Sequence, residues 1–343
     1  MRRALHSLTL RTKASTFILL HFLVQSTVSS PFDKYTTDFE FNYTSLVIFG
    51  DSYSVPPAIG GRYSNGPVWN EFLSLKLSTS TQKVTRLNYA YNGAHINNQL
   101  TSNTVPDTKT QISNYISDLH LYNSLNPPSN SDSRNVEKVL HMIWIGINPL
   151  ISLWRQSTLT TQDDHQIINV FHNVSFLMEL QIDQLSDQIE SLIQDSNVNQ
   201  LSPQFVILTP PLLHITQLIK TESNQRSKLN PELYNSYLSL MEMMETKFSK
   251  DLINKINLIS IQNDLSINHL SVFDTIKFWK DVEKKPKEYG ITTPGSCITD
   301  LHLIPCKNPN GFQYWDSLHP TSNFHSEVSS MIYEFLKQIQ STD

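Results

Sequence analysis

A serine near residue 50 has the sequence context expected of a nucleophile. Ser52 follows the apolar run Leu46–Phe49, which predicts a buried strand that ends at Gly50. A serine at this point would lie at the carboxyl end of a central strand, the edge at which open α/β sheets place their ligands. Gly-Asp-Ser is also an ordinary turn, so this stretch alone leaves both interpretations open.

A histidine late in the chain could act as the base for this serine. Asp316 precedes His319 by three residues, so one turn of backbone can bring its carboxylate to one imidazole nitrogen. The other nitrogen would then accept the Ser52 proton. On local sequence alone, a solvated Asp–His pair that caps the last helix is an alternative. A metal pair is a third interpretation, disfavoured because no other histidine or cysteine stands at ligand spacing.

Esterase chemistry on a serine also needs donors aimed at a developing oxyanion. Gly93 follows a predicted strand, and its bare backbone N–H can approach a ligand closely. Asn148 follows another strand and offers a neutral amide donor. Each could be part of a plain turn, but the joint occurrence of all these residues favours a serine hydrolase site.

The pattern after about residue 40 alternates apolar strands with helical stripes, which predicts a parallel sheet with crossover helices. The predicted strands are 45–49, 84–90, 139–145, 204–209 and 270–273. Three helices are predicted: one across 165–194, one with Asn230 as its cap and Pro231 in its first turn, and a last one with the apolar stripe Phe324, Val328, Met331, Phe335 and Ile339. Segments 123–135 and 195–202 are predicted to be polar loops.

Length and charge limit the function classes. The chain has 343 residues, enough for one large α/β unit with an ample core. Its net charge is −5, and acidic and basic residues are mixed throughout. Because no basic patch is interleaved with aromatic residues, we expect no nucleic-acid partner.

The first thirty residues have the composition of a secretory signal. A basic start is followed by the apolar run 17–24 and by small residues up to Ser30. This run is too short to span a bilayer comfortably, although an uncleaved anchor is an alternative. We therefore expect a signal peptide at 1–30, a single domain at 31–343, and a secreted protein without integral membrane association once the signal is removed.

Two further features agree with export. Asn42 and Asn173 each begin an N-glycosylation acceptor triplet. The chain has two cysteines, Cys297 and Cys306, and in an oxidising compartment a disulfide between them is the favoured interpretation. No metal-ligating partner lies near this pair, which argues against zinc.

Taken together, these motifs resemble the SGNH hydrolases of the GDSL type, particularly the secreted plant and fungal branch with its GDSL lipases and carbohydrate acetylesterases. The resemblance covers nearly all of the mature chain. The matching segments are Gly50-Asp51-Ser52-Tyr53 (serine block), Gly61 to Trp69 (a segment that this branch carries soon after it), Asn92-Gly93-Ala94 (glycine block), Gly146-Ile147-Asn148 (asparagine block) and Trp315 to Thr321 (histidine block).

The resemblance implies a flavodoxin-like three-layer α/β/α fold and a serine esterase without a metal or cofactor. Ser52 would be the nucleophile, His319 the general base and Asp316 its orienting acid. The backbone N–H groups of Ser52 and Gly93 and the amide of Asn148 would form the oxyanion hole.

One departure from the family pattern concerns the asparagine block. Pro149 stands where an aspartate commonly follows Asn148. A residue before proline is pushed toward extended geometry, so we expect a constraint on how Asn148 aims its amide. A misaimed amide would give a slow enzyme, since losing one oxyanion donor typically costs about 10²–10³ in kcat.

The expected function is a secreted carboxylic-ester hydrolase that removes acetyl or other short acyl groups from carbohydrate. An enzyme acting on longer lipid acyl chains is the alternative within the same chemistry. A secreted binding protein that has lost turnover is the alternative of another class. Other histidines are expected to be structural or solvent-exposed: His95, His141, His214, His302 and His325.

Overall fold

The computed structural model describes residues 41–55, 63–101, 103–125, 137–298 and 305–341. The chain divides into two compact units, Met1–Phe39 and Glu40–Asp343, and the structure described below belongs to the second. The predicted signal peptide at 1–30 lies outside the described residues, as does His302.

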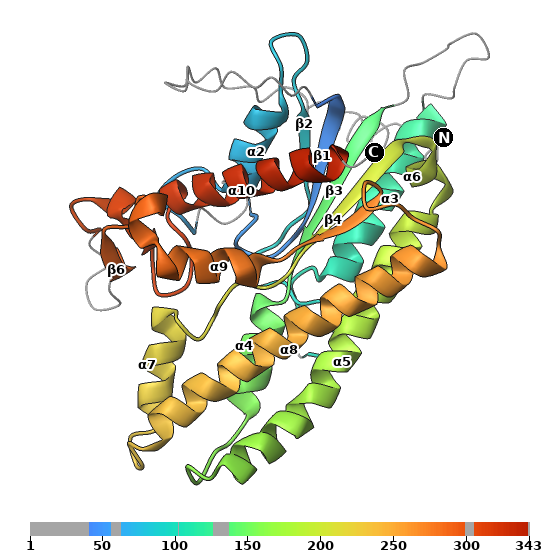
Figure 1. The fold of residues 1–343 in the computed structure, drawn as a ribbon. Helices are drawn as coiled ribbons and strands as arrows, with labels where there is room; N and C mark the ends of the chain where they lie inside the picture. The colour runs from blue at the N-terminus through green and yellow to red at the C-terminus, as the bar shows by residue number, and fades with distance from the viewer. Residues whose placement is uncertain (1–40, 56–62, 102, 126–136, 299–304, 342–343) are drawn as a thin grey trace, which may run out of the picture. The chain divides into compact units, whose positions relative to one another are not determined.

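A five-stranded sheet, parallel throughout, lies at the centre of the unit, with strand order β2-β1-β3-β4-β5 (Figure 1). This is the order of flavodoxin-like doubly wound folds, in which ligands bind at the carboxyl ends of the strands. Every predicted strand is confirmed to within two residues. The strands are β1 (Tyr43–Gly50), β2 (Thr85–Asn88), β3 (Lys138–Trp144), β4 (Ser202–Leu208) and β5 (Leu270–Phe273).

Helices cover both faces of this sheet and confirm the three-layer α/β/α architecture. α2 (Trp69–Leu77) packs against α10 (Ser322–Gln340) on one face. On the other face, α5 (Asp164–Gln194) lies between α3 (Thr108–Leu125) and α8 (Leu233–Gln262) (Figure 1). Because both faces are covered, the central strands are apolar on both sides, as the run Leu46–Phe49 shows by its complete burial.

Shorter elements connect these layers. They are α4 (Ile147–Gln156), α6 (Ser196–Gln200), α7 (Gln217–Arg226), α9 (Thr275–Lys284), the 3₁₀ turns η1 (Pro286–Tyr289) and η2 (Pro309–Gly311), and the two-stranded sheet of β6 (Thr293–Ser296) and β7 (Phe312–Tyr314). No helix in the described part of the chain is both long and apolar enough to cross a bilayer.

Two of the predicted local features are wrong. Asn230 is not a helix cap, because α8 begins at Leu233 and the Asn230 carbonyl instead accepts a turn hydrogen bond from Leu233 N at 3.1 Å. The predicted loop at 195–202 contains α6, which the Asp195 side chain caps by accepting hydrogen bonds from two backbone N–H groups. Of the other predicted loop, 123–125 belongs to α3 and 126–135 lies outside the described residues.

The remaining helix predictions are confirmed. α5 matches the predicted helix at 165–194 to within one residue. The stripe on α10 also faces the core, with Phe324, Val328 and Ile339 buried and Met331 and Phe335 half-buried.

The segment that leads to Asp316 is held by the predicted disulfide. Cys297 and Cys306 are joined, with 5.0 Å between their Cα atoms. Cys297 N donates to Tyr314 O at 2.9 Å, and the N–H of the next residue donates to Trp315 O at 2.7 Å. The covalent link therefore anchors the backbone immediately before the histidine block.

Candidate active site

The structure brings Ser52, Asp316 and His319 together at the carboxyl edge of the sheet. His319 Nε2 lies 2.8 Å from Ser52 Oγ. The other imidazole nitrogen, Nδ1, lies 2.8 Å from Asp316 Oδ2 and 3.0 Å from Oδ1. This pair does not cap the last helix, because the N-cap of α10 is Thr321.

The Asp316 carboxylate is held by the backbone of its own loop as well as by the imidazole. Its Oδ1 accepts from Leu318 N at 2.8 Å and from His319 N at 2.7 Å. Burial alone would raise the pKa of Asp316, but the hydrogen bonds and charge of His319, with the two backbone donors, hold this pKa below its usual value. The carboxylate is therefore ionised and can orient the ring of His319.

The turn that presents Ser52 depends on Gly50. Its φ is +156°, and a Cβ at this position would lie 2.3 Å from Trp144 O on the neighbouring strand β3. The Gln111 side chain bonds Gly50 twice, accepting from its N–H at 2.8 Å and donating to its carbonyl at 2.9 Å. These contacts fix the point at which β1 ends.

Tyr53 links this turn to the loop that carries His319. Its backbone N–H donates to Asp51 Oδ1 at 3.1 Å, and its hydroxyl donates to Leu318 O at 2.7 Å. The ring is buried and packs edge-on against Trp144. Tyr53 thus contacts the Ser52 turn through its backbone and the His319 loop through its hydroxyl.

Gly93 lies beside the nucleophile strand. The backbone N–H of Tyr91 donates to Gly50 O at 3.0 Å, which brings the loop after β2 against the end of β1. Gly93 has a φ of +72°, a conformation that glycine adopts without steric cost. Its N–H and that of Ser52 donate no hydrogen bond within the described part of the chain, so both are available to an oxyanion.

Asn148 is next to Gly93 in space. One of its amide protons is donated to Ala94 O at 3.0 Å, and the side chain is half-exposed. An amide carries two N–H donors, so the second remains for a ligand. This arrangement is compatible with the predicted oxyanion hole.

The expected effect of Pro149 on Asn148 is wrong. Asn148 is not extended but lies in the first turn of α4, after the cap residue Gly146. The first four N–H groups of a helix have no partner within it, so a proline in this turn removes no helical hydrogen bond. Gly146 makes this entry possible with a φ of +126°, in a position where a Cβ would lie 2.6 Å from Pro210 Cγ.

An aromatic residue that sequence reasoning passed over lies against the imidazole. The Tyr63 ring is tilted at 34° to the His319 ring, with 4.9 Å between their centroids. Its hydroxyl accepts a hydrogen bond from Asn92 Nδ2 at 2.5 Å, so the glycine-block loop holds it. Tyr63 therefore packs against the His319 imidazole.

The other described histidines do not join this site as bases. Burial lowers the pKa of His141 and of His325 to about 3, and both rings stay neutral. His95 is also buried, and burial lowers its pKa. Within the described residues, no group of three or more histidine, cysteine, aspartate and glutamate side chains is placed to hold a metal ion.

His214 belongs to a second imidazole–carboxylate pair. Its Nδ1 lies 2.5 Å from Oε1 of the fully buried Glu245, whose Oε2 also accepts from Leu213 N and His214 N. Helix α7 follows this loop directly and contacts the histidine block, because Leu218 N in its first turn donates to Ser317 O at 2.8 Å. Glu245 thus holds the loop that precedes α7, and α7 contacts the residue next to Asp316.

Two of the polar residues that position the site could have been found in the sequence by their place on a helix. Gln111 lies on the buried face of α3, and Glu245 lies on the buried face of α8. Buried polar groups need partners, so a glutamine or glutamate within an apolar stripe indicates a specific hydrogen bond.

Asp51, the residue before Ser52, has an unusually high pKa. Asp51 is fully buried, and its Oδ2 has no hydrogen-bond partner among the described residues. Burial raises the pKa of this carboxyl to about 7, although the hydrogen bond from Tyr53 N lowers it in part. Below neutral pH the carboxyl next to Ser52 is therefore uncharged.

Asp51→Asn is expected to remove a component of the pH dependence of stability. The folded-state pKa lies above the usual value of 3.8, so the folded protein binds the proton more tightly than the unfolded chain. Wild-type stability then falls as the pH rises from about 4 to about 7, by up to about 4 kcal/mol. Asparagine cannot ionise, so the free energy of unfolding of Asp51→Asn should rise relative to that of the wild type over this pH range. Urea unfolding at several pH values measures the difference.

The exposed Asp187 on α5 provides the control. Asp187→Asn makes the same substitution at an exposed side chain and should change the free energy of unfolding by little. A constant offset between Asp51→Asn and the wild type would contradict the assignment of a neutral Asp51.

Comparison with known proteins agrees with the resemblance seen in the sequence. The family described as GDSL-like Lipase/Acylhydrolase matches residues 46–332. The chain is 23% identical over 367 residues to "GDSL esterase/lipase 5" of Arabidopsis thaliana, covering 94% of this chain and 91% of that protein.

Solved structures with low identity show partial likeness. The lipase Lip_vut3 from a goat rumen metagenome has a TM-score of 0.43 at 13% identity, with 84% of this chain and 96% of that chain covered. Est24, a carbohydrate acetylesterase from Sinorhizobium meliloti, has a TM-score of 0.37 at 11% identity, with 85% and 99% covered. The assignment rests on the family match, which spans most of the sequence and includes both Ser52 and His319. The chain belongs to the GDSL-like lipase/acylhydrolase family and is an ester hydrolase.

Proposed function

We propose that this protein is a secreted serine carboxylic-ester hydrolase in which Ser52 is the nucleophile, His319 the general base and Asp316 the residue that orients the base. The observation that carries the proposal is the hydrogen-bonded chain from Ser52 Oγ through both nitrogens of His319 to the Asp316 carboxylate. A serine within 2.8 Å of an imidazole whose other nitrogen meets a carboxylate has the geometry of an activated nucleophile.

The proposed reaction runs through an acyl-enzyme. Ser52 Oγ attacks the ester carbonyl while His319 Nε2 takes its proton, and the Ser52 and Gly93 N–H groups with the Asn148 amide stabilise the oxyanion. The intermediate collapses when His319 returns the proton to the departing alcohol. His319 then activates a water molecule, which releases the acid from Ser52.

The proposed substrates are short acyl esters of carbohydrate. Tyr63 and Asn92 are hydrogen-bonded to each other, and the Tyr63 ring lies against the His319 imidazole, so an aromatic ring and an amide lie close to the proposed base. These groups suit hydroxyl-rich alcohols, because sugars combine apolar ring faces with many hydrogen-bonding groups. A lipase acting on longer chains is the second candidate, and the name of the esterase/lipase relative supports it. The alternative of an inert binding protein rested on Pro149, and the helical position of Asn148 removes that support.

Secretion is part of the proposal. It is supported by the signal-like composition of residues 1–30, by the disulfide of Cys297 with Cys306 and by two exposed acceptor asparagines, Asn42 and Asn173. Disulfides form and persist mainly in oxidising compartments, and N-glycosylation marks the same export route. Modification of both asparagines remains a prediction.

Ser52→Ala is expected to abolish hydrolysis of p-nitrophenyl acetate and labelling by a fluorophosphonate probe. The variant lacks the oxygen that forms the acyl-enzyme, while the fold loses only a hydroxyl. Steady-state rates and gel fluorescence measure the two effects. The matched control is Ser113→Ala on the exposed side of α3, which should leave both readouts unchanged. Retained turnover in Ser52→Ala would overturn the proposed nucleophile.

The acyl chain distinguishes the two candidate substrate classes. An acetylesterase should hydrolyse the two-carbon p-nitrophenyl ester with a kcat/KM at least roughly tenfold higher than that of the twelve-carbon ester. The reverse order, measured below the solubility limit of the longer ester, would support the lipase instead.

Asn148→Ala is expected to lower kcat by about 10²–10³ because one oxyanion donor is lost. KM should change little if the amide acts mainly in the transition state. The melting temperature should fall only slightly, since the side chain is half-exposed and loses one hydrogen bond, to Ala94 O. An unchanged kcat would remove Asn148 from the oxyanion hole.

A further inference from the structure

The imidazole of His319 carries a positive charge during the proposed reaction. The proton that leaves Ser52 Oγ goes to His319 Nε2 and stays there until the departing alcohol takes it. The Asp316 carboxylate meets this charge at the opposite edge of the ring, through Nδ1. Groups that lie against the faces of the ring therefore also affect the stability of the imidazolium.

Among the described residues, the rings of Tyr63 and Tyr53 lie close to this imidazole. The centroid of the Tyr63 ring is 4.9 Å from that of His319, and the two planes are inclined at 34°. The Tyr53 ring is farther away, at 5.9 Å, and more steeply inclined, at 53°. A cation within about 6 Å of an aromatic centroid is attracted to the electron-rich face of that ring. The inclination of Tyr63 is closer to stacking than to an edge-on contact, so Tyr63 is the better placed of the two.

The contact between the two rings is largely shielded from water. The His319 side chain is 14% exposed, and Tyr63 is half-buried. An aromatic ring stabilises a cation more strongly where water does not solvate that cation. The Tyr63 ring therefore has more effect on an imidazolium here than it would have on the protein surface.

The segment that carries Tyr63 is fastened to two other parts of the site. Asn92 Nδ2 in the glycine block donates to the Tyr63 hydroxyl at 2.5 Å. Asn65 Oδ1 accepts from Ser322 N at 2.7 Å, and Ser322 Oγ donates to Pro67 O at 2.8 Å. Ser322 begins α10, directly after the histidine block. The ring and the base are thus held by neighbouring backbone.

We propose that Tyr63 is a positioning residue of the esterase, whose ring stabilises the imidazolium form of His319 and keeps it directed at Ser52. This inference rests on the proposed function, because the imidazolium forms only if His319 is the base. A contact that strengthens as charge develops lowers the barrier and leaves substrate binding unchanged. His319 carries the same charge when the acyl-enzyme forms and when water releases it, so both steps depend on Tyr63.

Tyr63→Leu removes the ring and should lower kcat for p-nitrophenyl acetate roughly tenfold, with little change in KM. Tyr63→Phe keeps the ring and loses only the hydroxyl that Asn92 meets, so its kcat should stay within about threefold of wild type. Steady-state kinetics give both constants, and a melting temperature for each variant checks that it is folded.

Replacement of Tyr63 by trifluorophenylalanine, introduced by nonsense suppression, separates charge from packing. The fluorines withdraw electron density from the face of the ring and leave its shape close to that of phenylalanine. The kcat of this variant should fall below that of Tyr63→Phe and approach that of Tyr63→Leu. A role in packing alone would give the fluorinated and unfluorinated rings equal rates. This comparison holds even if Tyr63→Leu fails to fold.

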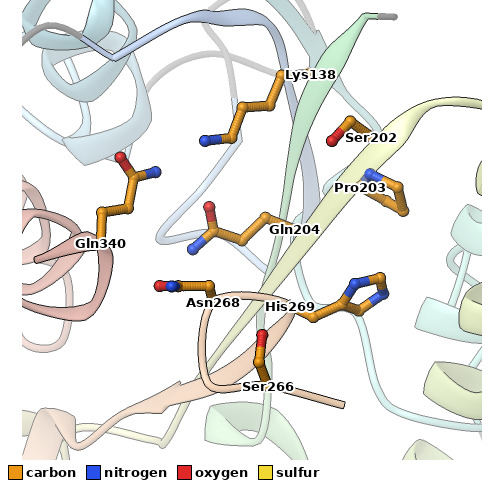
Figure 2. A pocket seen from close by; sticks show the side chains of 8 residues that line it. All are labelled: Lys138, Ser202, Pro203, Gln204, Ser266, Asn268, His269 and Gln340. Carbon is orange, nitrogen blue, oxygen red and sulfur yellow. The ribbon is translucent and has the colours of Figure 1, made fainter. Parts of the chain in front are cut away.

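The control tyrosine lies at the other end of the sheet. Lys138 begins β3 at that end and lines a polar pocket of about 320 Å³ (Figure 2). Near the end of α3, Asn123 donates to Asn197 at 2.9 Å, shortly before β4 begins, so this part of α3 lies at the same end. Tyr122 beside it is 52% exposed, and Tyr122→Leu should leave kcat within about twofold of wild type.

Ser52→Ala is measured alongside, so that the two proposals can fail separately. Turnover that survives in Ser52→Ala would reject the esterase mechanism and the role of Tyr63 with it. If Ser52→Ala is inactive, equal kcat in the fluorinated and unfluorinated variants would overturn the role of Tyr63 alone. An effect of Tyr63→Leu confined to KM would do the same, because it would place the ring in substrate binding.

Discussion

The close contact between β1 and β3 at Gly50 is the constraint on which the site depends. The two strands approach so tightly that no side chain fits between Gly50 and the carbonyl of Trp144. The chain turns at this point. The Gln111 side chain hydrogen-bonds both the N–H and the carbonyl of Gly50, where β1 ends. A turn fixed from both sides gives the following serine one position, and catalytic rates depend on geometry at the level of an ångström.

The His319 imidazole is fixed by contacts other than those that hold Gly50. Tyr53 connects the two sets, because it contacts both the Ser52 turn and the His319 loop. Asp316 accepts hydrogen bonds from its own loop and from His319, so the ring orientation is decided before any substrate arrives. The Tyr53 hydroxyl then bonds Leu318 O and sets the distance between the two loops. Preorganisation of this kind means that little rearrangement is needed when charge develops in the reaction.

Much of this arrangement could be predicted from the sequence, because it follows from strong local patterns. Continuous apolar runs identify buried parallel strands, and polar residues directly after them identify the functional edge, as with Ser52 and Asn148. What escaped prediction depends on contacts between distant segments. The geometry of Asn148 was misjudged because the preference of a residue before proline is statistical, and the helix start at Gly146 outweighs it. A buried glutamine or glutamate on an apolar helix face, such as Gln111 or Glu245, indicates that a hydrogen-bond partner exists. The local sequence does not say which distant backbone groups that partner is.

The separation of the reacting groups along the chain has a consequence for biosynthesis. Ser52 and His319 are 267 residues apart, and the strands between them must pair before the imidazole can reach the hydroxyl. Contacts this distant in sequence form late, after much of the chain has collapsed. In the proposed mechanism, a polypeptide still emerging from the ribosome can contain Ser52 and Gly93 but lacks the base until His319 has been made. The proposed hydrolysis therefore requires a chain that has been synthesised at least as far as His319.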